Sequence, residues 1–286
     1  MAGRNERQRR QARERYRRQQ EQRAARQRRV RRRALIGVSA LAAAGLLAGL
    51  LAAFLPGGSG KPKAAASASP TASASTVAEP AHHCTYTKAA PAPRTVSLPP
   101  PTPDYTASYT ATLNTNLGKI TFNLLNSKAT CTVNSFVHLA EAGYFDNTQC
   151  HRLVTSGIYV LQCGDPYATA TTKLTCSSSS KVGNGTPGYD FASENLSNAK
   201  YPAGTVAMAN NGTPDGNGSQ FFIVYKDSTS GLSASYTPFA TVSSGLGIVQ
   251  NVAKDGYSCQ YAEAGGGAPK QKVIIDSVTV HKTPKA

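Results

Sequence analysis

The chain has 286 residues, of which 40% are hydrophobic and 16% are charged, and its formal net charge is +16. The positive charge is concentrated at one end, since residues 1–33 contain 15 arginines against three glutamates and the other 253 residues carry only +4. A basic tail of this density could bind nucleic acid, but the apolar segment that follows it argues against that role, and we expect no nucleic-acid partner.

This apolar segment begins directly after the tail. Residues 34–55 span 22 positions without a charged or amide side chain, which is enough to cross a hydrocarbon core of about 30 Å. Because residues 31–33 are all arginine, the positive-inside rule places residues 1–33 in the cytoplasm and the rest of the chain outside the membrane. The alternative is a cleaved signal peptide and a secreted protein, but both the apolar run and the basic region are long for one.

Residues 56–104 have the composition of a linker. They contain ten of the 17 prolines, many Ala and Ser, and no sustained apolar periodicity, so they cannot bury enough apolar surface to offset the entropy of ordering. As a flexible coil the segment would span roughly 40 Å. His82, His83 and Cys84 lie within it, but adjacent histidines point in different directions and no further ligand follows at a suitable spacing, so we expect no metal and no cofactor.

The folded domain is predicted to occupy residues 105–286. Residues 109–113 and 119–124 alternate apolar and polar side chains around a turn at 114–118, which predicts a β-hairpin with one buried face. Residues 131–142 place apolar side chains three and four positions apart, with Gly143 where a C-terminal cap belongs, and so predict an amphipathic helix. Further strands are expected at 205–209, 220–224, 236–242 and 272–280, and a second short helix at 246–254.

Two motifs carry the chemistry. Residues 150–165 read CHRLVTSGIYVLQCGD, in which Arg152 and Gln162 interrupt apolar runs; an arginine is rarely buried without acceptors for its five donors. Residues 208–223 read MANNGTPDGNGSQFFI, a loop of turn residues that joins two apolar strands, and alone this would be an ordinary hairpin with a long tip. Together the two motifs resemble the cyclophilin family of peptidyl-prolyl isomerases, and the resemblance covers about residues 105–281.

The resemblance implies a fold. It predicts a mainly β domain built as a closed eight-stranded antiparallel barrel, with a packed interior and an α-helix over each end, whereas periodicity alone indicates only many strands and two helices. Residues 166–188 are much longer than the family's connection at this point, and we expect them to form an inserted surface loop that leaves the core untouched.

The resemblance also implies the site. Arg152 matches the family's catalytic arginine, which would donate to the nitrogen of the twisted bond before proline, and Gln162 matches the glutamine that orients it. Phe222 matches the floor of the proline pocket. The other substrate-binding residues carried over are Tyr159, Val160 and Leu232 on the pocket walls, Asn210 and Gln220 along the peptide, and Tyr236 at the rim.

This chain departs from the family's pattern at several positions. Two extra residues lie between Arg152 and Gln162, one lies between Asn210 and Gly218, and Val160 replaces a methionine. The family's cyclic peptide ligand, cyclosporin, is held in part by a Trp, for which this chain has Gly231 and no Trp anywhere. We therefore expect weak inhibition by cyclosporin, partly restored by Gly231→Trp.

All six cysteines follow the apolar segment, which fits an oxidising compartment. Fifteen pairings are possible, and we predict a Cys131–Cys150 disulfide because the helix start and the strand leading to Arg152 should meet at one end of the barrel. Cys150 beside His151 could suggest a thiol nucleophile. Neighbours on a strand point to opposite faces, so we interpret His151 as structural.

Two functions follow. The favoured one is a membrane-anchored, extracytoplasmic and monomeric prolyl isomerase that acts on exported proline-containing polypeptides. The alternative is a catalytically weak proline-peptide binding module or chaperone on the same scaffold, which the altered pocket walls suggest. Retention of Arg152, Gln162 and Phe222 favours the enzyme.

Overall fold

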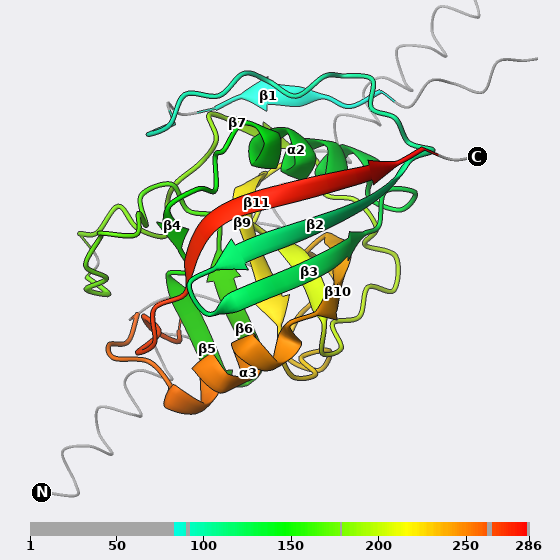
Figure 1. The fold of residues 1–286 in the computed structure, drawn as a ribbon. Helices are drawn as coiled ribbons and strands as arrows, with labels where there is room; N and C mark the ends of the chain where they lie inside the picture. The colour runs from blue at the N-terminus through cyan, green and yellow to red at the C-terminus, as the bar shows by residue number, and fades with distance from the viewer. Residues whose placement is uncertain (1–82, 90–91, 178, 262–264, 285–286) are drawn as a thin grey trace, which may run out of the picture. The chain divides into compact units, whose positions relative to one another are not determined.

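The computed structural model describes residues 83–89, 92–177, 179–261 and 265–284, which contain eleven β-strands and two α-helices (Figure 1). The helices are α2 (Thr130–Glu141) and α3 (Leu246–Asp255). The strands are β1 (Tyr86–Lys88), β2 (Ser108–Thr115), β3 (Gly118–Leu124), β4 (Thr148–Gln149), β5 (Arg152–Ser156), β6 (Ile158–Cys163), β7 (Tyr189–Phe191), β8 (Thr205–Asn210), β9 (Asn217–Val224), β10 (Pro238–Ser244) and β11 (Ile274–Thr283).

The strands form one antiparallel sheet in the order β1-β7-β9-β8-β10-β3-β2-β11-β4, and β6 pairs with both β9 and β5. The predicted hairpin is confirmed, with Leu113 opposite Ile120 and Tyr109 opposite Leu124 in β2 and β3. Along β2 and β3 the apolar side chains alternate into a core that includes Leu113, Ile120 and Phe122. This alternation is the period-two pattern of a strand with one buried face.

The expected eight-stranded closed barrel is wrong in two respects: the sheet has eleven described strands, and its ladders do not close into a ring. The gap falls between β4 and β5, which are consecutive in the chain. The Cys150 N–H donates to the Val273 carbonyl (2.9 Å), whereas the next N–H, of His151, donates to the Gln162 carbonyl (3.0 Å). The chain therefore changes neighbours at this point, and the two arms of the sheet are joined covalently.

The two helices lie at opposite ends of the sheet (Figure 1), and both were predicted within two residues of their observed bounds. Helix α2 buries Val133, Phe136, Leu139 and Ala140, and the Phe136 ring lies 5.6 Å from that of Phe221. After the helix, Gly143 has φ +65°, a left-handed conformation that glycine adopts without strain.

The described part of the predicted linker, residues 83–89 and 92–104, is folded onto the domain. β1 pairs with β7, with Tyr86 opposite Phe191, and Cys84 forms a disulfide with Cys131 in α2. Arg94 donates from Nη1 to the carbonyls of Tyr144 (2.9 Å) and Asp146 (2.7 Å). The structured domain therefore begins before Tyr105.

The predicted tail and transmembrane helix, residues 1–33 and 34–55, lie outside the described residues. Among the helices that the structure describes, none is long and apolar enough to cross a membrane.

The predicted Cys131–Cys150 disulfide is wrong. The bonds are Cys84–Cys131, Cys150–Cys163 and Cys176–Cys259. Cys150 and Cys163 flank the ladder of β5 and β6, so their Cα atoms lie 4.0 Å apart, whereas Cys131 faces the segment that carries β1.

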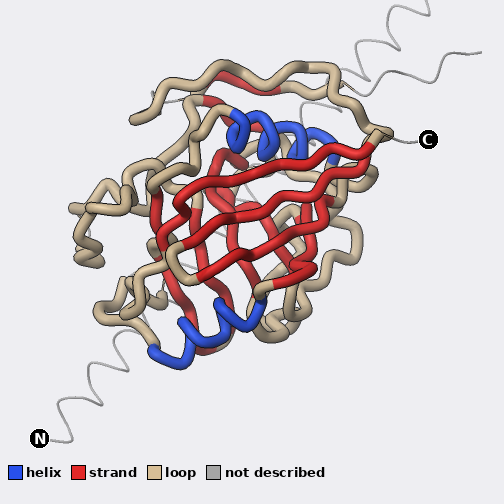
Figure 2. Tube along the Cα trace, viewed as in Figure 1, coloured by secondary structure: helices blue, strands red, loops and turns tan. Residues whose placement is uncertain are grey.

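The inserted segment 166–188 contains no helix or strand among its described residues, as expected of a loop. It is not separate from the core, because Ala168 is fully buried and Gln149 donates from Nε2 to the carbonyls of Thr169 and Thr172, both at 2.7 Å. Figure 2 shows it and the long connection between α3 and β11 as loops on the same side of the sheet.

Candidate active site

Three neighbouring strands bring the main predicted residues into one row. Arg152 on β5 is opposite Gln162 on β6, and Gln162 is in turn opposite Phe222 on β9. Because side chains alternate between the two faces of a strand, Gln220 lies on the same face of β9 as Phe222. Residues distant in sequence thus share one patch of the outer face of the sheet.

A chain of hydrogen bonds runs through the polar half of this row. Arg152 donates from Nη1 to Gln162 Oε1 (2.9 Å), and Gln162 donates from Nε2 to Gln220 Oε1 (2.9 Å). Gln220 donates from Nε2 to the carbonyls of Gly183 (3.1 Å) and Gly185 (2.9 Å) in the inserted loop. Arg152 also donates from Nε to the Gly265 carbonyl (2.9 Å). The guanidinium is therefore fixed in a definite orientation.

The charge of Arg152 survives its partial burial. Burial lowers the pKa of Arg152, while the neighbouring Tyr236 and Tyr261 act in the opposite direction. A guanidinium starts from a pKa above 12, so it stays protonated at neutral pH. The site thus presents a fixed positive charge at the edge of an apolar surface.

That apolar surface surrounds Phe222. The residues buried with it are Val154, Val160, Tyr201, Ala207 and Val224, and those packed against the cluster include Ile158, Ala209, Leu232 and Tyr236. The rings of Phe222 and Tyr236 meet edge to face with centroids 5.5 Å apart. Four of the predicted residues, Val160, Phe222, Leu232 and Tyr236, therefore belong to one cluster, and Phe222 connects it to the row of Gln162 and Arg152.

Comparison with known proteins decides the family. A family model described as "Cyclophilin type peptidyl-prolyl cis-trans isomerase/CLD" matches residues 110–280, more than half of the chain. This chain is a member of the cyclophilin family.

Individual relatives support the same assignment. The proteins named probable peptidyl-prolyl cis-trans isomerase B in Mycobacterium leprae and Mycobacterium tuberculosis are each 42% identical to the chain over 189 residues, 60% of its length. The match covers 57% and 54% of their lengths, so the chain spans just over half of these relatives. A crystal structure of a cyclophilin-type isomerase from Cryptosporidium parvum superposes with a TM-score of 0.50 at 26% identity, covering 62% of this chain and 99% of that one.

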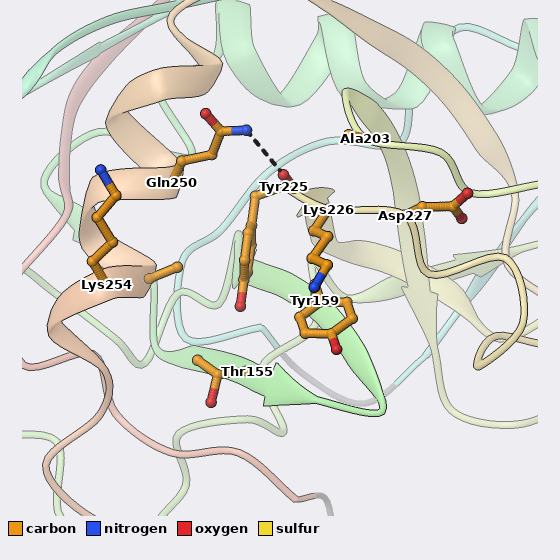
Figure 3. A pocket seen from close by; sticks show the side chains of 9 residues that line it. Thr155, Tyr159, Ala203, Tyr225, Lys226, Asp227, Gln250 and Lys254 are labelled. Atoms are coloured by element: carbon orange, nitrogen blue, oxygen red, sulfur yellow. Dashed lines mark hydrogen bonds between the residues drawn. The ribbon is translucent and has the colours of Figure 1, made fainter.

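Tyr159 does not join the apolar cluster of this cyclophilin. It lies on the face of β6 opposite to Val160, and it lines a separate hollow with Tyr225, Lys226 and the end of α3 (Figure 3). The Lys226 ammonium lies 4.5 Å from the centre of the Tyr159 ring. The wall position beside Val154 and Val160 is taken by Ile158 instead.

The side-chain amides of Asn210 and Gln220 are both engaged in hydrogen bonds within the protein. Asn210, at the end of β8, donates from Nδ2 to the Ser235 carbonyl (2.8 Å), which ties it to the loop before Tyr236. Gln220 is a link in the polar chain, bonded on both sides of its amide. Their proposed contacts with substrate stay predictions.

Four participants were missed by the sequence argument: the Ile158 side chain and the carbonyls of Gly183, Gly185 and Gly265. The two extra residues between Arg152 and Gln162 were the available indication for Ile158, because they lengthen the β5–β6 hairpin. A backbone carbonyl leaves no mark in a sequence, so the three carbonyls could not be found.

The lengthened hairpin also overturns the expectation for Gly231→Trp. A Cβ atom added at Gly231 would collide with the Gly157 carbonyl and come within 2.7 Å of the Ile158 side chain. The hairpin tip therefore occupies the space that a side chain at position 231 would enter, and this substitution cannot rebuild the rim.

Proposed function

We propose that this cyclophilin catalyses cis-trans isomerisation of the peptide bond before proline, with Arg152 as the main catalytic residue. The uncatalysed rotation faces a barrier of about 18–20 kcal/mol, because resonance gives the C–N bond partial double-bond character. Raising the rate from about 10⁻² to 10² per second requires on the order of 5–6 kcal/mol. The reaction breaks no covalent bond, so it needs only groups that favour the twisted state.

The two halves of the site suit this requirement. In the twisted state the nitrogen becomes pyramidal and can accept a hydrogen bond, and a fixed charged donor aimed at such an atom contributes roughly 3 kcal/mol. The cluster around Phe222 offers an apolar surface for the proline ring, and burial of such a ring contributes at about 25 cal/mol per Å². The observation that carries the proposal is the fixed guanidinium of Arg152, bonded to Gln162 and Gly265 beside that surface.

The test is an isomerisation assay with the full chain, purified in detergent with its disulfides intact. A Xaa-Pro peptide should relax from cis to trans at least tenfold faster with catalytic amounts of protein. If the peptide binds but its exchange rate is unchanged, the alternative of a proline-peptide binding module is favoured instead.

We further propose that the clients are exported proline-containing polypeptides at the outer face of the cell membrane. The Arg-rich tail and apolar segment 34–55 support this, as do three disulfides that pair all six cysteines. Intact cells expressing the chain should retain the domain in the membrane fraction, where added protease releases it. Release into the medium without protease would favour signal cleavage.

A further inference from the structure

We propose that the inserted loop 166–188 is part of the catalytic apparatus, because it anchors the hydrogen-bond chain that positions Arg152. This rests on the proposed role of Arg152. Gln220 is then a positioning residue, and the Cys176–Cys259 disulfide holds together the two loops that secure the ends of the chain.

The hydrogen-bond chain from Arg152 to the inserted loop has a direction, which the groups at its two ends impose. A guanidinium can only donate hydrogen bonds, and a backbone carbonyl can only accept them. The Gly183 and Gly185 carbonyls therefore require the Gln220 amide to present its NH₂ group to the loop, which turns Oε1 towards Gln162. Gln162 in turn faces Arg152 with its oxygen. Each amide thus satisfies its neighbour in only one orientation.

The loop carbonyls are themselves held from below. The fully buried Asp165, two residues after the end of β6, accepts hydrogen bonds from the backbone N–H groups of Gly183 and of Tyr167 (2.8 Å for Tyr167). A Cβ atom at Gly185 would collide with the Asp165 carboxylate. The two carbonyls therefore sit on a packed base and not on a loosely attached surface segment.

The other end of the hydrogen-bond chain, at Gly265, is equally constrained. The Gly265 carbonyl, which accepts from Arg152, precedes Gly266 and Gly267, and Gly267 exchanges two backbone hydrogen bonds with Leu153 (2.8 and 2.9 Å). A Cβ atom at Gly266 would collide with the Leu153 carbonyl, and the φ of +65° at Gly266 favours glycine. The Gly265 carbonyl is thus held against the strand that bears Arg152.

One disulfide joins the loops at the two ends. Cys176 lies in the inserted loop and Cys259 lies in the connection between α3 and β11. The Ala268 N–H also donates to Cys176 Sγ (3.3 Å), and Tyr261 N–H donates to the Gly266 carbonyl (2.9 Å). The bond therefore restrains the two sources of anchoring carbonyls relative to each other.

Two matched glutamine variants of the protein test whether the inserted loop positions Arg152. Gln220→Met and Gln149→Met each remove two hydrogen bonds from a glutamine Nε2 to carbonyls of the inserted loop. Both replacements are unbranched and uncharged, but only Gln220 is bonded to Gln162. We expect kcat/KM to fall about tenfold in Gln220→Met, the size of one lost hydrogen bond of about 1.4 kcal/mol, and less than threefold in Gln149→Met.

A second readout does not depend on turnover. The ¹⁵N relaxation of the Arg152 side-chain Nε should show faster motion in Gln220→Met than in Gln149→Met, with the full chain in detergent. Equal activity in the two variants, together with equal Arg152 mobility, would overturn the proposal. If the unmodified chain shows no isomerase activity, the proposed function fails, whereas the relaxation comparison still decides whether the loop positions Arg152.

The disulfide has its own comparison. Replacing Cys176 and Cys259 together by Ala should lower kcat/KM at least threefold, because small displacements of a catalytic group are costly. The control replaces Cys84 and Cys131, whose bond joins α2 to the segment before β1 and neither of the two loops, and should leave kcat/KM within twofold. Similar activity in the two double variants would refute the role given to the Cys176–Cys259 bond.

Discussion

Phe221 and Phe222 are neighbours on β9, yet they belong to opposite faces of the sheet and to different tasks. Phe221 is fully buried inside, with its ring 5.6 Å from that of Phe136 and 5.7 Å from that of Phe145. Phe222 is 4% exposed on the outer face, where its ring meets Tyr236 and shares a row with Gln162. Phe221 contributes to the packing of the core, whereas Phe222 lies in the candidate active site. Substitutions of these two residues should therefore separate effects on stability from effects on activity.

The largest effect should come from the inner face. Phe221→Ala removes a ring from a cluster of aromatic contacts and should lower the free energy of unfolding by about 3–5 kcal/mol. Phe222→Ala should lower the free energy of unfolding by less, because the Phe222 ring has fewer aromatic neighbours. It should lower the isomerase activity by more, because this ring lies in the candidate active site. Urea unfolding and the isomerisation assay measure both quantities, and a greater stability loss in Phe222→Ala would contradict the division.

On the outer face, Arg152→Ala should lower kcat/KM by about 100-fold, which corresponds to about 2.7 kcal/mol of transition-state stabilisation. The free energy of unfolding should change little by comparison. Arg152→Lys is the control, because it keeps the charge but loses the planar fork that bonds Gln162 and Gly265. Activity of Arg152→Ala within threefold of the parent would show that the charged donor is not the main source of catalysis.

His151 extends the comparison to pH, because it is buried immediately before the partly buried Arg152. Burial, and secondarily the charge of Arg152, lowers the pKa of His151 to about 3. In the unfolded chain His151 binds a proton below about pH 6.5, whereas in the folded chain it stays neutral at that pH. The free energy of unfolding should therefore fall as pH drops below about 6.5.

Between pH 7 and pH 5 this contribution amounts to about 2 kcal/mol. Urea unfolding at the two pH values measures it, and His151→Phe should remove that part of the pH dependence. An unchanged pH dependence in His151→Phe would mean that other groups cause it.

The smallest effect concerns the rim of the outer face. Gly231 supplies neither area nor a donor to a ligand, and the hairpin tip at Gly157 and Ile158 fills the adjacent space. Cyclosporin should therefore inhibit this cyclophilin at least tenfold more weakly than relatives that carry the rim Trp, a difference of about 1.4 kcal/mol. Tight inhibition in a titration against the isomerisation assay would contradict this account of the rim.

Sequence reasoning reached the parts of the molecule that local patterns control. The β2–β3 hairpin and both helices follow from periodicity and from Gly143, and the row of Arg152, Gln162 and Phe222 follows from two motifs. Tyr159 was misplaced because a longer β5–β6 hairpin changes which side chains reach the outer face near its tip. Such a shift cannot be resolved by counting residues from either end.

The features that depend on long-range contacts were not predicted, for a different reason. The segment 83–104 has the composition of a linker, and its attachment depends on partners far along the chain, namely β7, Cys131 and the carbonyls of Tyr144 and Asp146. The disulfide pairing and the contacts of the inserted loop share this dependence on the tertiary fold. No local pattern within these segments specifies it.

The pairing of β1 with β7 has a consequence for any shortened form of the protein. A domain cut at Tyr105 would keep Cys131 as an unpaired thiol on a partly exposed turn of α2, where it could cross-link two molecules. The cut would also make β7 the edge strand at this end of the sheet, a place that β1 holds in the longer form. Exposed thiols can cross-link and exposed strand edges can pair with other chains, so we expect residues 83–104 to limit association of the domain with its own copies.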